Sequence, residues 1–336
     1  MKTTKAALVV GANGGIGSET CLALLRHGWR VRALVRTPKA DATDGVEYVR
    51  GDAMTAADVL HAAEGVDLIV HAVNPAGYRG WDRVVLPMLD NTIAAAKAVG
   101  ARIVLPGTIY NYGPDAFPLL TENSPQHPTT RKGEIRAAME QRLEQASREG
   151  TPVLILRCGD FFGPRSTANS WFSQGLTKPG VPVRKVTYPG RLDIGHAWAY
   201  MPDVAETLAR LLDRENELST FAVFHFGGYW LDGHGMVEAI RRATGDQNIA
   251  VARFPWWMVT LASPFMETLR EMRKMRYLWR TPVQLDDARL VAFLGAAPYT
   301  PIEEAIRVTL EGAGCLSVDD RVAGGGVVGG PVKQAV

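Results

Sequence analysis

The stretch Ala7-Leu8-Val9-Val10-Gly11-Ala12-Asn13-Gly14-Gly15-Ile16-Gly17 decides the fold. A short aliphatic run typical of a buried strand leads directly into a Gly-x-x-Gly-x-x-Gly loop, and a helical pattern follows. Glycine permits the tight turn, the approach of a pyrophosphate to the backbone and the close packing of helix on strand, while the first N–H groups of the helix face the phosphates. The alternative is a glycine-rich turn without a ligand. We predict a dinucleotide site formed by Gly11, Asn13, Gly14, Gly15, Ile16 and Gly17.

The alternation of strand and helix continues from this loop to about residue 160. Runs of β-branched and aliphatic residues predict strands at Ala6–Val10, Val31–Val35, Val46–Val49, Leu68–His71, Arg102–Leu105 and Val153–Leu156. Helical patterns lie between them near Ile16–His27, Thr55–Ala62, Arg83–Val99 and Arg131–Glu149. Strands joined by helical crossovers of this length are typical of an α/β fold with a doubly wound Rossmann-type parallel sheet.

The regularity weakens after residue 160, and this change divides the chain. Residues 1–160 are expected to form the dinucleotide-binding Rossmann domain, and residues 161–311 mainly a smaller C-terminal substrate lobe rich in Trp, Gly and Pro. The strand and helix patterns near 196–228 are expected to return to the first domain. Residues 312–336 end in a glycine-rich stretch without periodicity and are predicted to be a disordered tail.

The composition is that of an ordinary globular protein. Of 336 residues, 46% are apolar and 21% charged, which excludes disordered and collagen-like classes. The formal charge of +2 favours small-molecule partners over nucleic acid. Three cysteines, Cys21, Cys158 and Cys315, form neither a disulfide framework nor a CxxC pair. Because no signal-peptide core and no spanning apolar run is found, the sequence predicts a cytoplasmic protein.

The end of the second strand indicates which dinucleotide is bound. NAD enzymes usually carry an acidic residue there, whereas this segment reads Val31-Arg32-Ala33-Leu34-Val35-Arg36-Thr37. Arg32 and Arg36 could pair with a 2′-phosphate, which favours NADP(H) over NAD(H); the alternative is two surface arginines without a ligand. Asp52, after the third strand, is placed to accept from the adenine amino group or to cap a helix.

Further motifs resemble those of the extended short-chain dehydrogenase/reductases, the NAD-dependent epimerase/dehydratase family. Leu156–Pro164, with its Leu-Arg start and Phe-Gly-Pro end, is similar to the family's stretch after the sixth strand. Tyr200–Ala205 is similar to the YVxDVA helix start, and Thr300–Ala305 to the closing segment. The resemblance covers nearly all of residues 5–311. It implies an NAD(P)-dependent reaction on a small molecule and is compatible with a homodimer.

Members of this family usually act through a Ser or Thr, a Tyr and a Lys, with an upstream Asn. By resemblance, Thr108 falls where the hydroxyl that orients the substrate belongs, and Asn91 is similar to the helix asparagine. The helix that should carry Tyr-x-x-x-Lys instead reads Lys132-Gly133-Glu134-Ile135-Arg136. Lys132 therefore takes the place of the tyrosine and Arg136 that of the lysine.

This departure changes the chemistry available to the site. Arginine cannot donate a proton usefully near neutral pH, but Arg136 could hold the nicotinamide ribose. Lys132 lies one turn away on the same helix face, so cation repulsion and burial should lower its pKa and suit it to general acid or base catalysis. Either Lys132 replaces the tyrosine or proton transfer here is lost. Tyr110 and Tyr112 are alternative proton donors, or else aromatic packing at the cleft wall.

Several other residues are placed near the expected ligands. Ala72 and Asn74 follow the fourth strand and are assigned to the nicotinamide side, next to His71. No pair of histidines has metal-ligand spacing, His196 and His225 included, so no metal is predicted. Substrate contacts are expected in the loops 74–81, 160–171 and 191–200.

The segment Phe254–Arg280 combines aromatic residues with a basic helix. Trp256 and Trp257 precede five basic residues, Arg270, Arg273, Lys274, Arg276 and Arg280. Such a combination occurs in helices that bind a membrane surface. Two prolines and two glutamates interrupt it, so a helix covering the substrate lobe, or a subunit contact, is the alternative.

The leading interpretation is an NADP(H)-dependent oxidoreductase that transfers a hydride between nicotinamide and a carbonyl or alcohol substrate. An NAD(P)-dependent epimerase or dehydratase acting on a sugar-type substrate is one alternative. Its diphosphate clamp could come only from the scattered Arg165, Arg184 and Arg191. The other alternative is a non-catalytic protein that senses NADP(H).

Overall fold

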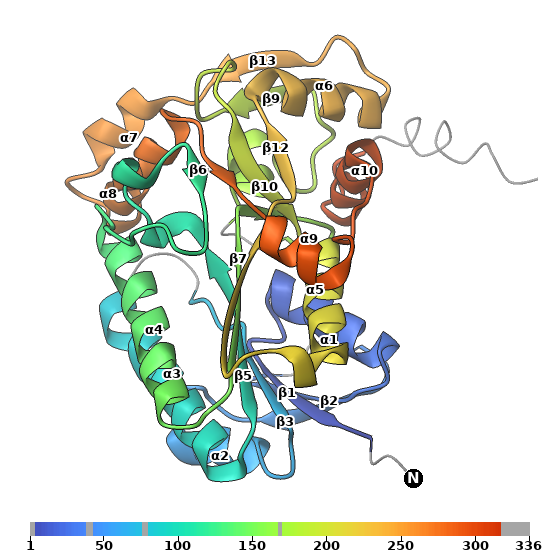
Figure 1. Ribbon diagram of the computed structural model, residues 1–336. Coiled ribbons are helices and arrows are strands. Elements are labelled where there is room, and N and C mark those ends of the chain that lie inside the picture. The colour runs from blue at the N-terminus through green and yellow to red at the C-terminus, as the bar shows by residue number, and fades with distance from the viewer. Residues whose placement is uncertain (1–3, 38–42, 76–79, 167–169, 317–336) are drawn as a thin grey trace, which may run out of the picture.

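The computed structural model describes residues 4–37, 43–75, 80–166 and 170–316. Its centre is a seven-stranded parallel sheet in the order β3-β2-β1-β4-β5-β7-β11 (Figure 1). The strands are β1 (Ala6–Val10), β2 (Arg30–Val35), β3 (Val46–Arg50), β4 (Leu68–His71), β5 (Arg102–Thr108), β7 (Val153–Cys158) and β11 (Phe221–Phe226). This order confirms the predicted doubly wound Rossmann-type sheet. The direction of winding reverses between β1 and β4, where ligands bind in such sheets.

Helices cover both faces of the sheet. Helices α1 (Gly15–Arg26) and α5 (Met201–Asp213) lie on one face, and α2 (Ala56–Ala62), α3 (Trp81–Val99) and α4 (Arg131–Arg148) on the other (Figure 1). All five residues of β1 are therefore buried, with Val9 in the core under α1 and Val10 in the core under α3. A continuous aliphatic strand is the expected sequence for such a doubly covered position.

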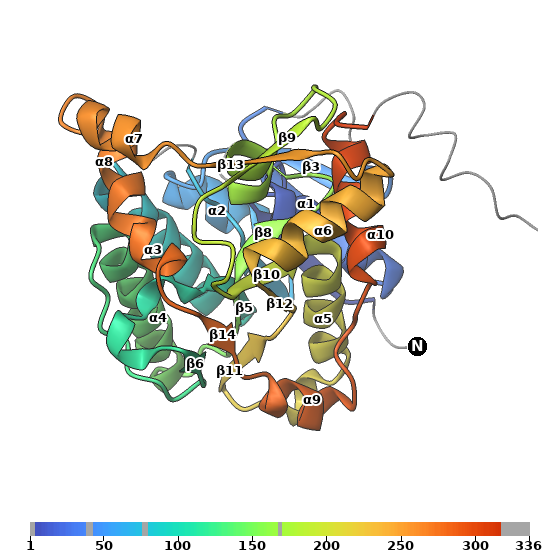
Figure 2. The same ribbon diagram turned by 90° about the horizontal axis from the view of Figure 1, so that it is seen from above.

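A second lobe stands at the carboxyl end of the sheet and is built from three small sheets (Figures 1 and 2). They pair β12 (Tyr229–Leu231) with β10 (His196–Tyr200) and β8 (Asp160–Phe162), β13 (Ala250–Arg253) with β9 (Lys185–Tyr188), and β14 (Gln284–Leu285) with β6 (Leu119–Leu120). The helices of this lobe are α6 (Gly233–Thr244), α7 (Trp256–Ala262), α8 (Glu267–Lys274) and α10 (Ile302–Gly312), whereas α9 (Ala288–Leu294) packs against β11 of the main sheet. Strand β10 thus belongs to the lobe, whereas β11 returns to the main sheet.

The C-terminal segment differs from the sequence prediction. Residues 312–316 were assigned to a disordered tail, but Gly312 ends α10, and Cys315 and Leu316 are buried. The Val183 amide donates to the Cys315 carbonyl at 3.1 Å, which fastens this end to the lobe. Glycine content concealed the packing, because the apolar pair Cys315-Leu316 is too short to form a periodic pattern. The remainder of the predicted tail, 317–336, lies outside the described residues.

Candidate active site

The glycine loop lies at the reversal point of the sheet, between β1 and α1. Gly11 has φ +92°, and a Cβ there would lie 2.6 Å from the backbone of Val73. A Cβ on Gly17 would lie 2.3 Å from the carbonyl oxygen of Gly11. Gly14 caps α1 and offers no side chain to its first N–H groups. These N–H groups therefore face a cradle kept open by glycine, which fits a dinucleotide pyrophosphate.

The two arginines assigned to a 2′-phosphate occupy different places. Arg36 is exposed just after β2, beside Thr37, whose carbonyl accepts a 3.2 Å hydrogen bond from Asn13 of the glycine loop. Arg32 lies four residues earlier, and its Nη1 donates to the carbonyl oxygens of Ala62 (2.7 Å) and Glu64 (2.9 Å) at the end of α2. Arg32 thus binds a helix end, whereas Arg36 is exposed beside the residue that contacts the glycine loop.

The Asp52 side chain accepts a hydrogen bond within its own turn. Its Oδ1 accepts from the Met54 amide at 2.9 Å, and the N-cap position of α2 belongs to Thr55, whose side chain makes no capping hydrogen bond. The helix-capping alternative for Asp52 is therefore wrong. Its other oxygen is the part of the side chain left for an adenine amino group.

Helix α4 contacts the loop after β4, where the sequence predicts the nicotinamide side. Arg136 Nη2 donates to Asn74 Oδ1 at 3.1 Å, and the guanidinium lies 5.3 Å from the ring centre of Trp81. Burial lowers the pKa of Arg136, and its Nε is a buried nitrogen without a hydrogen-bond partner among the described residues. The structure thus brings Arg136 and Asn74 together, with Ala72 two residues before Asn74, directly after β4.

His71 lies under this contact, at the end of β4. Its Nδ1 is 2.8 Å from Thr92 Oγ1, which itself donates to the Met88 carbonyl, so the imidazole donates through Nδ1. Burial, reinforced by the charge of Arg136, lowers the pKa of His71 to about 3 and keeps the ring neutral. Its Nε2 is a buried acceptor that finds no partner in the part of the chain described.

Lys132 lies one helical turn before Arg136 and faces two aromatic rings. Its Nζ is 4.2 Å from the ring centre of Tyr110 and 5.0 Å from that of Trp81. Burial lowers the pKa of Lys132 to about 7, and the charge of Arg136 acts in the same direction, against smaller opposing effects of Asp160 and Glu271. This is the chemistry that the substitution of lysine for tyrosine predicts.

A chain of polar contacts runs from Tyr110 into the second lobe. The Tyr110 hydroxyl donates to Asp160 Oδ1, and Asp160 Oδ2 is 2.7 Å from His196 Nε2. His196 Nδ1 is 3.3 Å from the Leu278 carbonyl, and its ring stacks on Trp279 with centroids 3.9 Å apart. Asp160 and His196 are both buried. The chain holds the Tyr110 ring in fixed orientation beside Lys132.

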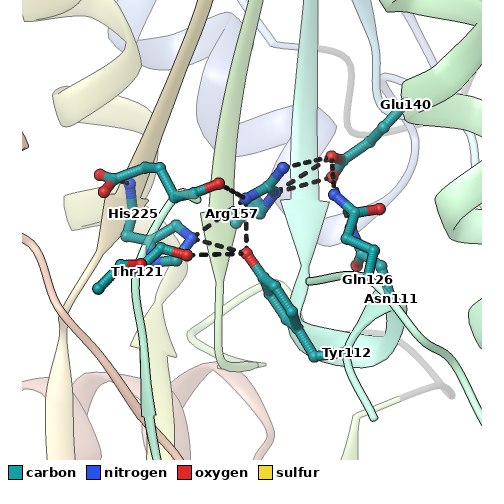
Figure 3. A network of polar contacts seen from close by, with 8 residues as sticks. Asn111, Tyr112, Thr121, Gln126, Glu140, Arg157 and His225 are labelled. Carbon is teal, nitrogen blue, oxygen red and sulfur yellow. Dashed lines mark hydrogen bonds and ion pairs between the residues drawn. The ribbon is translucent and has the colours of Figure 1, made fainter. Parts of the chain in front are cut away.

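Tyr112 belongs to a separate buried network (Figure 3). Its hydroxyl accepts from Arg157 Nη1 at 2.5 Å and lies 3.0 Å from His225 Nε2. Arg157 of β7 also binds Glu140 of α4 through three contacts of 2.7–3.1 Å. Burial raises the pKa of Tyr112. Tyr112 is fully buried, and its hydroxyl links Arg157 of β7 to His225 of β11, while Glu140 ties Arg157 to α4.

Thr108 and Asn91 are placed by local hydrogen bonds. Thr108 ends β5, half-buried, and its Oγ1 accepts from the Tyr110 amide at 3.3 Å. Asn91 of α3 donates to the Ala53 carbonyl at 2.9 Å, which supports the loop after β3. Thr108 thus binds the backbone of Tyr110, whereas Asn91 supports a loop.

The contact between Asp160 and His196 is the part of the site that sequence reasoning missed. The two residues are 36 positions apart, and the sequence indicates no partner for His196. The signal exists only in strand pairing, because the parallel register of β8 with β10 sets Asp160 opposite Trp198. A sequence without pairing information does not contain that register.

Comparisons with known proteins agree with this geometry. The model of the NAD dependent epimerase/dehydratase family matches residues 7–226. A 2-alkyl-3-oxoalkanoate reductase of Stenotrophomonas maltophilia is 29% identical over 174 residues, covering 47% of this chain and 51% of that protein. A ceramide reductase of Caulobacter vibrioides is 27% identical over 187 residues, covering 53% and 54%. The chain therefore spans about half the length of these curated relatives.

The fold is shared with solved structures over nearly the whole chain. The UDP-glucose 4-epimerase of Bifidobacterium longum, in complex with NAD+ and UDP, has a TM-score of 0.70 at 17% identity, covering 91% of this chain and 97% of that one. At that identity the likeness concerns the fold. The glycine cradle, the sheet order and the match over residues 7–226 lead to one conclusion: the chain belongs to the NAD dependent epimerase/dehydratase family.

Proposed function

We propose that this protein is an NADP(H)-dependent oxidoreductase that reduces the ketone of an apolar substrate, or oxidises the corresponding alcohol. The observation that carries the proposal is the position of Lys132, whose Nζ lies over the Tyr110 ring, one turn from an Arg136 that contacts Asn74. A lysine with a pKa of about 7 can donate a proton near neutral pH. The two curated relatives, both named as reductases, support the same reaction class.

Each side chain then has a defined task. The dinucleotide, when bound, supplies or accepts the hydride. The Lys132 ammonium donates a proton to the substrate oxygen as the carbonyl is reduced, and the neutral amine is reprotonated from solvent. Arg136 would hold the ribose, and Thr108 would hydrogen-bond the substrate oxygen. The Tyr110–Asp160 contact keeps the ring under Lys132 in place.

An apolar substrate is favoured over a sugar nucleotide by the second lobe. Arg165, Arg184 and Arg191, the candidates for a diphosphate clamp, form ion pairs with Glu19, Asp246 and Asp193. The lobe instead contains a cluster of aromatic rings. The ring centroid of Trp171 lies 5.4 Å from that of Trp279 and 6.0 Å from that of Trp256. The name of the Stenotrophomonas relative, a 2-alkyl-3-oxoalkanoate reductase, agrees with a ketone on an alkyl chain.

Lys132→Met tests the catalytic assignment. With NADPH and a panel of 3-oxo esters, kcat should fall by about 100-fold or more, because the proton donor is lost. The dissociation constant for NADPH should stay within about twofold. Lys185→Met, which removes an exposed lysine from β9, is the matched control and should retain wild-type turnover. Wild-type turnover in Lys132→Met contradicts the assignment, and loss of turnover in Tyr110→Phe alone would transfer the role to Tyr110.

Arg36→Ala tests the cofactor. Wild-type protein should bind NADPH at least about tenfold more tightly than NADH in calorimetric titrations, and Arg36→Ala should remove that preference. Arg30→Ala, at the opposite end of β2 and equally exposed, is the control and should leave the preference intact. Equal affinity of the wild type for NADH and NADPH would refute the assignment. If none of NADPH, NADP⁺, NADH and NAD⁺ binds, the enzymatic proposal as a whole is refuted.

A further inference from the structure

Helix α7 of the second lobe and the turn that follows it carry a group of large apolar side chains in contact with solvent. Helix α7 and the turn through Pro264 to α8 project from one corner of the molecule (Figure 2). The exposed fractions are 67% for Trp257, 68% for Leu261 and 89% for Phe265, and Met258 and Met266 are exposed as well. We call these five residues the apolar tip. A contiguous exposed apolar group of this kind marks an interaction site.

The opposite face of the same segment is firmly packed. Trp256 and Val259 are buried in the lobe, and Trp256 Nε1 donates to the Pro189 carbonyl at 2.6 Å. After α8, Met275 and Leu278 are buried too. Helix α7 is thus apolar on both faces, and only its inner face has a partner among the described residues. A helix that is apolar all round needs a second apolar environment.

Basic residues lie on both sides of the apolar tip in the sequence, most of them after it. Residues 253–280 contain six basic against two acidic residues. Five of the basic residues are exposed, Arg253, Arg270, Arg273, Lys274 and Arg280, and we call them the basic collar. One acidic residue, Glu271, is bound to Lys274 at 2.8 Å. The collar therefore keeps a net positive charge next to the apolar tip.

We propose that the apolar tip inserts into the headgroup region of a lipid bilayer that carries anionic lipids, with the basic collar on the headgroups. Trp, Leu and Phe beside Lys and Arg are the combination that holds interfacial helices at such surfaces. A subunit interface is less well matched, because the centres of protein interfaces are depleted in charge and the tip is a narrow projection. No described helix is long and apolar enough to cross a bilayer, so attachment would be peripheral.

The residues that follow α8, from Met275 to Trp279, contact the candidate active site. Met275 Sδ accepts from Thr130 Oγ1, at the start of the helix that carries Lys132, with 3.6 Å between the atoms. The Tyr277 hydroxyl donates to the Tyr112 carbonyl at 3.1 Å, and Trp279 stacks on His196. A membrane-bound tip would therefore bring this site next to the bilayer. The docking proposal itself stands independently of the reaction catalysed.

Vesicle sedimentation of the full chain tests the proposal. The wild type should sediment with vesicles of equal parts phosphatidylcholine and phosphatidylglycerol, and much less with phosphatidylcholine alone or at high salt. The double variant Leu261→Ser/Phe265→Ser should bind about tenfold less, and so should Arg270→Glu/Arg273→Glu. The control Trp230→Ser/Tyr299→Ser, which alters exposed aromatic residues outside the tip, should bind like the wild type.

Two results would overturn the proposal. One is wild-type protein that stays in the supernatant with both kinds of vesicle. The other is undiminished sedimentation of both double variants, whose folding is verified by an unchanged melting temperature and NADPH affinity. Analytical ultracentrifugation without lipid tests the alternative that a second copy of the chain covers the tip. A dimer that only the tip variants dissociate, together with no vesicle binding, would make the tip a subunit contact. Because sedimentation needs no turnover, failure here leaves the proposed reaction to its own test.

Discussion

At the scale of single residues, the site depends on how burial acts on a lysine. A tyrosine in the position of Lys132 would be neutral over the whole physiological range and could lie on apolar surface without cost. The lysine is instead stacked on Tyr110 and Trp81 and repelled by Arg136, and its pKa falls to about 7. The rings compensate part of the lost hydration through cation–π contact. The amine can then change its charge near neutral pH.

The pKa of Lys132 predicts the pH dependence of catalysis. Ketone reduction needs the ammonium, so kcat should be constant below about pH 7 and fall about tenfold per unit above it, whereas alcohol oxidation needs the neutral amine and should fall below pH 7. Arg136→Met removes a like charge, which raises the pKa of Lys132 and moves both profiles to higher pH. Arg142→Met, on an exposed part of α4, should leave them unchanged. Profiles without inflection between pH 6 and about 8 would contradict the role of Lys132.

At the scale of elements, helix α4 organises the site from one face. Lys132, Arg136 and Glu140 are spaced by four residues, so they follow one another along the same side of the helix. Lys132 faces the Tyr110 ring, Arg136 contacts the loop after β4, and Glu140 binds Arg157 of β7. The contact between Glu140 and Arg157 fixes the position of α4 along the direction of the strands. The positions of the first two residues depend on it.

The Glu140–Arg157 pair predicts a large stability effect. Both side chains are buried, so Glu140→Ala leaves an uncompensated guanidinium in the core and should lower the free energy of unfolding by about 3–5 kcal/mol. Glu144→Ala, which breaks the exposed pair with Arg148 on the same helix, should cost about 0.5 kcal/mol or less. Urea denaturation measures both. Similar losses for the two variants would mean that the buried network does not anchor α4.

At the scale of the whole molecule, the candidate site lies where the sheet and the second lobe meet (Figure 1). The sheet supplies the glycine loop, Tyr110 and the residues after β4, and the lobe supplies Asp160, His196 and Trp279. The proposed membrane contact belongs to the same lobe. Substrate entry, substrate binding and proton transfer would therefore depend on how the lobe is held against the sheet.

Much of the sheet could be predicted from the chain alone. All six strands proposed up to residue 160 are present, within a few residues of their expected bounds, because doubly covered strands require continuous apolar runs and crossover helices require their own period. The basic helix expected within Phe254–Arg280 is present as α8 but ends at Lys274, and the preceding aromatic residues begin a separate helix, α7, which ends before Pro264. Residues 312–316 were misassigned because two apolar residues make no pattern.

What the sequence by itself determined are the features that depend on neighbours along the chain: the glycine loop with its uncapped helix, and Lys132 one turn before Arg136. Tertiary structure alone decided that Arg32 binds the end of α2 and that Tyr110, not Tyr112, faces Lys132. It also joined Asp160 to His196. The physical reason is distance along the chain: local sterics and helix geometry act over a few residues, whereas these contacts are set by strand register and by the packing of the lobe on the sheet.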